Sequence, residues 1–202
     1  MIAERRLYQF MNAAVESDVV RYTSMMIEMH STARPVLFNA VVATGTGAHE
    51  YTAATTTVMC CLSKGLAAPV GSLLAGSAEI IGAARVERKR LGGAMRQAGV
   101  IAAAGIVALE SMIERLADDH GRARRLAEAV ADRWRACGLD PATVRTNCVV
   151  FRHPDTAALL AHLAEAGILA GTIAPNMVRF MTHVDVDDAG VERVRKAVSA
   201  AP

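Results

Sequence analysis

The stretch TTTVMCCLSKGLAAPVGSLLAGS, residues 55–77, decides the fold of this chain. Residues 55–62 are β-branched and apolar on both faces, which is typical of a buried strand in a parallel or mixed sheet. A polar turn at residues 63–65 follows and contains Lys64, and residues 70–75 predict a second strand. Lys64 is therefore expected at the carboxyl edge of a sheet, where open α/β sheets bind their ligands.

A lysine at that edge has a specific chemical use. Its pKa is lowered when the amine is partly desolvated, and the neutral amine then attacks a carbonyl carbon to form a Schiff base. On the tripeptide Ser63-Lys64-Gly65 alone, an ordinary solvated lysine in a turn is the alternative.

Outward from this stretch, the sequence predicts helices and a second group of strands. Ser77 has the residue type and position of a helix N-cap. The composition and the order of the expected strands and helices change at Asp140-Pro141, where a second α/β lobe is expected to begin. We therefore expect domains at residues 1–139 and 140–202. The expected helices cover residues 78–90, 95–116, 118–138, 156–166 and 187–200, and the expected strands of the second lobe cover residues 146–151, 167–172 and 177–183.

The composition excludes several classes of protein. The chain has 202 residues, of which 52% are hydrophobic, and its formal net charge is +2. A disordered chain is excluded, and a nucleic-acid binder would need a clustered basic face. The longest apolar stretch, residues 98–109, is shorter than the roughly 20 residues that span a bilayer. Since the start also lacks a signal-peptide pattern, we expect a cytoplasmic protein that binds neither nucleic acid nor membrane.

The four cysteines indicate a reducing compartment. Cys60 and Cys61 are adjacent, whereas Cys137 and Cys148 stand alone. No pair has the spacing of a metal site, so no metal is implied. Adjacent cysteines in an apolar run are most often small buried side chains, and we expect that of this pair.

A longer series of motifs resembles one enzyme family. CLSKGLAAPVGSLLAGS is followed by RKRLGGAMRQAGVIAAAGIVALE and, near the end of the chain, by NMVRFMTHVDVDDAGVERV. These motifs resemble the threonine aldolases, a family of fold-type-I enzymes that use pyridoxal 5'-phosphate, and the resemblance covers roughly residues 37–200. It implies an α/β fold: the C-terminal portion of the aspartate aminotransferase-like fold, with part of the large domain and the small α/β domain.

The resemblance also implies roles for six residues. Lys64 would form the Schiff base with the cofactor, and Ser63 would lie beside it. Arg179 resembles the arginine that grips the substrate carboxylate, for which a guanidinium fork is well suited. Arg34 corresponds to a second carboxylate-contacting arginine. Two further basic residues match the family's cofactor region, with a solvated helix face or a subunit interface as their alternatives: Lys89 and Arg96.

Two departures from the family pattern bear on activity. The family carries a His-x-Asp-Gly-Ala-Arg segment, whose aspartate keeps the pyridine nitrogen protonated so that the ring accepts electrons. Ser31 stands at that place in Met-His-Ser-Thr-Ala-Arg, residues 29–34. Residues 1–29 contain no glycine and nothing that resembles the family's glycine-rich phosphate loop. We therefore expect a chain that is shortened at its N-terminus relative to the family.

Three hypotheses about function follow. The first is a lyase that depends on pyridoxal phosphate and cleaves a β-hydroxy-α-amino acid, threonine or allo-threonine, to glycine and an aldehyde. It would act on a small amino-acid substrate as a homo-oligomer. The second is a catalytically inactive remnant or assembly partner, without the phosphate-binding loop and the aspartate that pairs with the pyridine nitrogen. In the third, another subunit supplies the missing loop.

Overall fold

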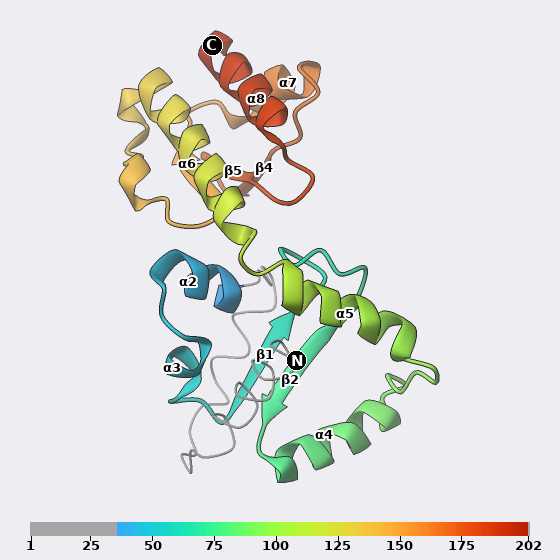
Figure 1. Ribbon diagram of the computed structural model, residues 1–202. Helices are drawn as coiled ribbons and strands as arrows, with labels where there is room; N and C mark the ends of the chain where they lie inside the picture. The colour runs from blue at the N-terminus through green and yellow to red at the C-terminus, as the bar shows by residue number, and fades with distance from the viewer. Residues whose placement is uncertain (1–35, 202) are drawn as a thin grey trace. The chain divides into compact units, whose positions relative to one another are not determined.

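A computed structural model describes residues 36–201, which form two compact units that divide between Glu114 and Arg115 (Figure 1). We expected the division near residue 140. It falls earlier because the long helix α6 (Leu116–Arg133) packs on strand β3 (Cys148–Arg152) and helix α8 (Asp188–Ala200) of the second unit. No helix among the described residues is long and apolar enough to cross a membrane.

The first unit is built around a two-stranded antiparallel hairpin. Met59 of the first strand is paired with Leu74 of the second, and the two described strands are antiparallel, whereas the sequence predicted a strand of a parallel or mixed sheet. One face of the pair is exposed, since Met59 and Leu74 are 44% and 42% accessible, although we expected burial on both faces. The elements of this unit are α2 (Val36–Thr44), α3 (Ala48–Thr52), β1 (Thr57–Cys61), β2 (Ser72–Gly76), α4 (Ala78–Arg90) and α5 (Gly99–Ser111).

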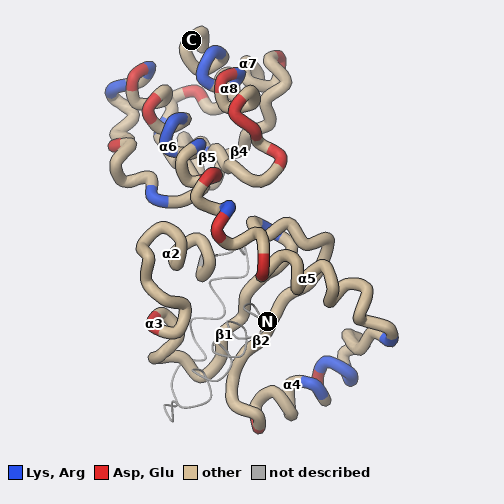
Figure 2. The backbone as a smooth tube through the Cα atoms, viewed as in Figure 1, with Lys and Arg blue, Asp and Glu red and all other residues tan. Residues whose placement is uncertain are grey.

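The limits of α4 and α5 have local causes. The Ser77 side chain caps α4 by accepting a hydrogen bond from the backbone N–H of Ile80 at 3.3 Å, as predicted. Helix α5 begins later than the expected residue 95, because Gly92 and Gln97 adopt left-handed backbone conformations with φ of 75° and 52°. Charged side chains gather at the end of α4, whereas β1, β2 and most of α5 carry none (Figure 2).

The second unit is a three-stranded antiparallel sheet with three helices. The strand order is β3-β5-β4, and β4 and β5, which correspond to the expected strands at residues 167–172 and 177–183, form an antiparallel hairpin. Its further elements are α7 (Thr156–Glu165), β4 (Gly171–Ala174), β5 (Met177–Met181) and two short 3-10 turns, η2 (Arg135–Cys137) and η3 (Pro141–Thr143). Asp187 caps α8 by accepting a hydrogen bond from Gly190 N–H at 2.7 Å.

This unit has a continuous apolar core. Phe151 lies at its centre, with ring centroids 5.8 Å from Trp134 and 5.2 Å from Phe180. Such aromatic pairs stabilise a core beyond the area that they bury. Other members are fully buried and come from the sheet and from all three helices: Val130, Val149, Leu159, Leu163, Val178, Val191 and Val198.

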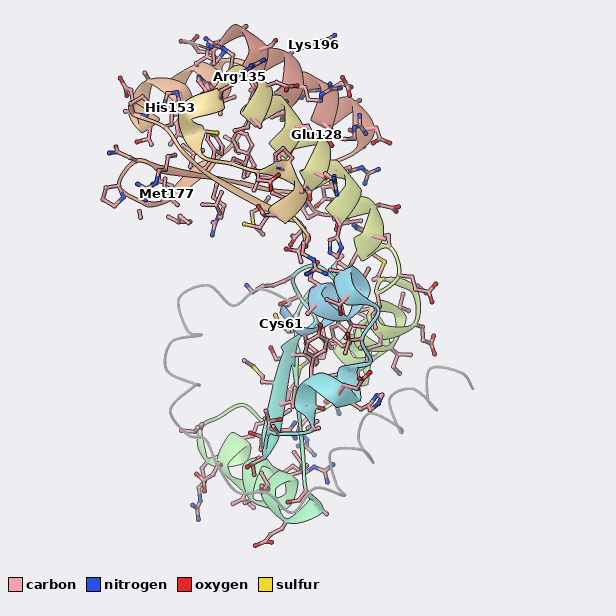
Figure 3. The ribbon with its side chains drawn as sticks, turned by 90° about the vertical axis from the view of Figure 1, so that its left-hand side faces the viewer. Cys61, Glu128, Arg135, His153, Met177 and Lys196 are labelled. Carbon is pink, nitrogen blue, oxygen red and sulfur yellow. The ribbon has the colours of Figure 1, made fainter. Side chains whose placement is uncertain are left out.

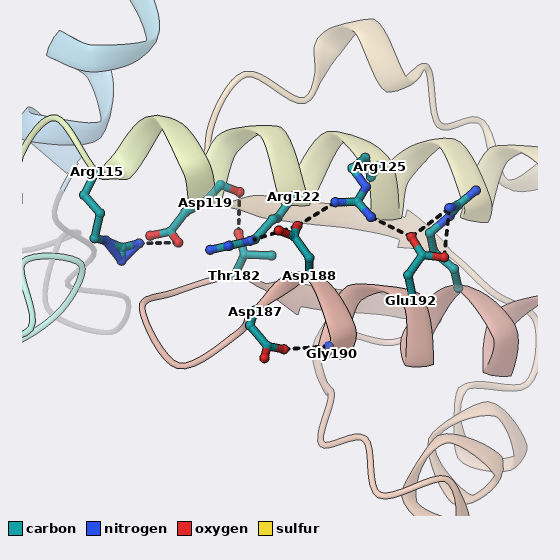
Figure 4. Close-up of polar contacts among 10 residues, drawn as sticks. Arg115, Asp119, Arg122, Arg125, Thr182, Asp187, Asp188, Gly190 and Glu192 are labelled. Atoms are coloured by element: carbon teal, nitrogen blue, oxygen red, sulfur yellow. Dashed lines mark hydrogen bonds and ion pairs between the residues drawn. The ribbon is translucent and has the colours of Figure 1, made fainter.

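A ladder of ion pairs joins α6 to α8 on the surface of the second unit (Figure 4). Arg125 contacts Asp188 at 2.7 Å and Glu192 at 2.5 Å, and Arg122 contacts Asp188 at 3.4 Å. Hydrogen bonds from Arg122 and Arg125 lower the pKa of Asp188. Because these groups are largely exposed, solvent screens them and their contribution to stability is small.

Candidate functional site

Lys64 lies in the loop between β1 and β2, and the backbone of that loop is extensively hydrogen bonded. Leu62 N–H donates to the Gly71 carbonyl at 2.9 Å, which continues the strand pairing beyond β1. Ala68 N–H donates to the Leu62 carbonyl at 3.0 Å, and Ala67 N–H donates to the Lys64 carbonyl at 2.9 Å. The loop therefore holds the Lys64 backbone in place while its side chain is exposed.

Ala67, three residues after Lys64, has an unusual backbone conformation. Its φ is 57°, in the left-handed region that residues with a Cβ rarely adopt. Such a conformation costs on the order of 1 kcal/mol and is retained where the surrounding structure enforces it, frequently at functional sites. The strained residue is thus part of the loop that carries the candidate catalytic lysine.

Cys61 lies at the end of β1 (Figure 3), and the charge of Lys64 acts on its thiol. Its thiol lies 3.3 Å from the Ser63 hydroxyl. Partial burial raises the pKa of Cys61, but hydrogen bonds with Ser63 and Ser72 and the charge of Lys64 outweigh this effect, so the net pKa is lowered.

Its neighbour Cys60 is buried, and burial together with the Cys61 charge raises the pKa of Cys60 to about 11. The sequence predicted two inert buried thiols, which is confirmed for Cys60 and wrong for Cys61. Neighbouring residues of a strand face opposite sides of a sheet. This alternation could have predicted that only one of the two cysteines is buried.

Lys89 and Arg96, the two other basic residues that we expected near the cofactor, form no ion pair with any described residue. Lys89 is exposed in the last turn of α4, and Arg96 is exposed in the segment before α5. Within residues 36–201, no hydrogen bond or ion pair joins the side chain of either residue to Lys64 or Ser63. Their roles at the cofactor stay predictions.

Arg179 lies on β5, the central strand of the second unit. It is paired with Val150 of β3 on one side and with Gly171 of β4 on the other. Its neighbours in sequence, Val178 and Phe180, are buried in the core, so Arg179 occupies the opposite face.

The Arg179 side chain is half-buried, and among the described residues it forms no ion pair. A half-buried guanidinium can donate two parallel hydrogen bonds to the oxygens of a carboxylate. The remaining expected carboxylate ligand, Arg34, lies outside the described residues, as does Ser31.

Comparison with known proteins identifies the family. The model of the beta-eliminating lyase family matches residues 29–154. The chain belongs to this family. Among its relatives, the probable low-specificity L-threonine aldolase 2 of Arabidopsis thaliana is 39% identical over 163 residues, which cover 78% of this chain and 46% of that protein.

A bacterial relative is similar to this chain to about the same extent and is also only partly covered by it. The low specificity L-threonine aldolase of Escherichia coli strain K12 is 41% identical over 152 residues, which cover 74% of this chain and 44% of that protein. This member of the beta-eliminating lyase family thus spans less than half the length of these relatives.

Solved structures establish the fold of this family member. A putative L-allo-threonine aldolase from Listeria monocytogenes superposes with a TM-score of 0.61 at 18% identity, covering 84% of this chain and 50% of that one. A serine palmitoyltransferase from Sphingomonas wittichii superposes with a TM-score of 0.59 at 20% identity, covering 76% and 41%. The fold is therefore the aspartate aminotransferase-like fold of pyridoxal-phosphate enzymes, as the sequence predicted.

Pyridoxal phosphate is the cofactor that this family implies, and the described residues fit its aldehyde end. An aldehyde requires an accessible primary amine, and Lys64 is exposed and forms no ion pair within residues 36–201. Ser63 in this loop and Ser72 at the start of β2 place two hydroxyl groups beside Cys61, and hydroxyls donate to anionic oxygens. The loop between β1 and β2 thus offers the groups that the carbonyl end of the cofactor needs.

Proposed function

We propose that this chain supplies the cofactor lysine and the carboxylate-binding arginine of a pyridoxal-phosphate-dependent threonine aldolase. The reaction is the retro-aldol cleavage of a small β-hydroxy-α-amino acid, such as threonine or allo-threonine, to glycine and an aldehyde. The observation that carries the proposal is the exposed amine of Lys64, which forms no ion pair with any described residue, on a hydrogen-bonded loop in a chain of the beta-eliminating lyase family.

Each residue has a defined task in this proposal. The cofactor, when bound, supplies an electron sink for the carbanion that forms as the Cα–Cβ bond breaks. Lys64 holds the cofactor covalently, and Ser63 donates a hydrogen bond beside it. Arg179, with Arg34, binds the substrate carboxylate through paired hydrogen bonds and so fixes the direction of the Cα–Cβ bond. Lys89 and Arg96 add positive charge on the cofactor side.

The proposal includes a homo-oligomer in the cytoplasm. Most large apolar side chains that are exposed in the described structure belong to the first unit, among them Leu91 at 84%, Val100 at 79% and Val107 at 56%. Where such side chains form a contiguous patch, the patch is typical of a protein-protein interface. A second subunit that covers it would lower the free energy of the assembled state.

An absorbance titration tests the proposal. Purified protein is mixed with pyridoxal phosphate beside a Lys64→Ala variant, and bound cofactor is reduced with borohydride and located by peptide mass spectrometry. We expect a Schiff-base absorption band and a label at Lys64, both lost in the variant. A folded wild-type sample with no specific band would contradict the proposal and favour an inactive member of the family. If the band appears, release of glycine and aldehyde from threonine is measured next.

A further inference from the structure

Gly171 is the residue of β4 that is paired with Arg179 of β5. Cross-strand partners of an antiparallel pair lie on the same face of the sheet, with Cα atoms about 4.5–5.5 Å apart. The other partner of Arg179 is Val150 of β3, whose side chain is half-buried. Arg179 therefore lies between a branched side chain on one neighbouring strand and bare backbone on the other.

The neighbours of Arg179 along its own strand are apolar. Met177 and Met181 lie two positions away on β5, so they share the face of Arg179, and both are half-buried. With Val150, these side chains flank Arg179 on three sides. The fourth side is β4, the edge strand in the order β3-β5-β4, and at the level of Arg179 it carries no side chain. An anion that approaches Arg179 over β4 thus meets no side chain at its paired position.

Neither the backbone nor the packing of β4 requires a glycine at this position. Gly171 is not among the glycines with a left-handed backbone conformation. Apart from its chain neighbours, no described atom lies within 4 Å of a Cβ built on Gly171, whereas a Cβ at Gly105 would lie 3.0 Å from Leu62. Glycine weakens a strand, and it often marks a site where a ligand or another backbone approaches closely. The open space beside Arg179 fits the approach of a ligand.

The strand is also irregular directly after this position. The pairing register of β4 with β5 shifts between Thr172 and Ala174, so Ile173 is an extra residue in β4. Such a bulge bends its strand, and bulges are over-represented at sheet edges and next to active sites. The strand therefore bends immediately after the residue that is paired with Arg179.

We propose that Gly171 is a positioning residue for the substrate carboxylate. Its missing side chain leaves open the side from which the carboxylate reaches the Arg179 guanidinium. The inference rests on the proposed function, because that function assigns the carboxylate to Arg179. It adds a position on β4 that determines which ligands reach the arginine. A side chain at residue 171 occupies the space that the carboxylate needs, while the sheet itself has room for it.

The experiment measures access to Arg179 in the full chain and needs neither cofactor nor turnover. Phenylglyoxal condenses with arginine guanidinium groups, and peptide mass spectrometry quantifies the label at Arg179 relative to Arg145, which is exposed before β3. The labelling is repeated with propionate as a plain carboxylate probe. The variants are Gly171→Ala and Gly171→Val. The matched control is Ala174→Val, which adds a branched side chain to the same strand beside Met177.

We expect the ratio of Arg179 label to Arg145 label to fall at least about fivefold in Gly171→Val, and less in Gly171→Ala, because the added atoms crowd the approach. Ala174→Val leaves the ratio unchanged. Propionate lowers the ratio in the wild type and no longer does so in Gly171→Val. Urea unfolding followed by Trp134 fluorescence shows a midpoint that is unchanged or higher in both Gly171 variants, because a strand favours a residue with a Cβ.

An unchanged label ratio in Gly171→Val would overturn the assignment. A lower unfolding midpoint in Gly171→Ala would overturn it as well, because the glycine would then be required by packing. A wild-type chain that propionate protects at Arg179 but that does not bind pyridoxal phosphate would support the role of Gly171 and reject the proposed function. A chain that binds the cofactor and shows no effect at residue 171 would reject this inference alone.

Discussion

The core of the second unit predicts that two leucines six positions apart contribute very differently to its free energy of unfolding. Leu163 of α7 is fully buried, whereas Leu169 in the following loop is 96% exposed. Replacing a buried leucine with alanine costs about 2–5 kcal/mol, through the lost transfer free energy and the cavity that remains. Because Leu163 is enclosed on all sides, we expect about 3 kcal/mol for Leu163→Ala and less than about 0.5 kcal/mol for Leu169→Ala.

The assay is urea unfolding followed by the fluorescence of Trp134. This is the single tryptophan of the chain, and its ring lies 5.8 Å from Phe151 and 5.0 Å from His153 within the second unit. Its fluorescence therefore reports on this unit. With a slope of about 1 kcal/mol per molar urea, the expected loss for Leu163→Ala shifts the midpoint by about 3 M, or leaves the unit unfolded in water.

A loss below about 1 kcal/mol for Leu163→Ala would refute this account of the core. An equal loss in free energy of unfolding in Leu163→Ala and Leu169→Ala would also refute it, because burial of the leucine would then make no difference to stability. The Leu163→Val variant removes a single CH₂ and is the finer probe, with an expected loss of about 1 kcal/mol.

Three further predictions concern the candidate site. Cys61 should react with iodoacetamide with a midpoint below pH 9.0 and Cys60 only near pH 11, because the thiolate is the nucleophile; peptide mass spectrometry across pH measures both. Gly82→Ala in α4, where a Cβ meets no atom, should stabilise the first unit by about 0.5–1 kcal/mol, whereas Gly105→Ala should lose that gain by crowding the hairpin, as thermal unfolding will show. Under the proposed function, Arg179→Lys keeps the charge but cannot form the paired hydrogen bonds to the substrate carboxylate, so we expect kcat/KM for threonine to fall roughly 10- to 100-fold.

Local patterns predicted much of the secondary structure. Ser77 caps α4 as predicted, and Asp187, which we expected as the first residue of the last helix, is the N-cap of α8. The sequence predicts a helix from residue 95, but α5 begins at Gly99. The residue type of Gln97 does not indicate its left-handed conformation, which delays the start of the helix. The division of the units also depends on tertiary packing, since only the contacts of α6 with β3 and α8 assign that helix to the second unit.

The candidate site shows the same limit at shorter range. Lys64 was found from the sequence because a motif and a strand end coincide there. Two features near Lys64 were not predicted: Ala67 has a φ of 57°, and α5 approaches Leu62 closely at Gly105. Neither follows from propensity, because alanine does not favour a left-handed conformation and glycine is unfavourable within a helix. Both are local costs that the packing between the loop and the helix must offset.

The two units differ in how completely each buries its apolar side chains, and this difference bears on function. The second unit encloses Phe151, Leu159 and Leu163 in a core of its own, and it presents Arg179 from the central strand of a rigid sheet. The first unit carries Lys64 but leaves Met59 and Leu74 exposed on the face of its hairpin. Lys64, which meets a cofactor and a substrate in the proposed function, therefore lies on the unit whose described residues leave more apolar surface exposed. Binding of a cofactor, a substrate or a second subunit is therefore expected to stabilise the first unit more than the second.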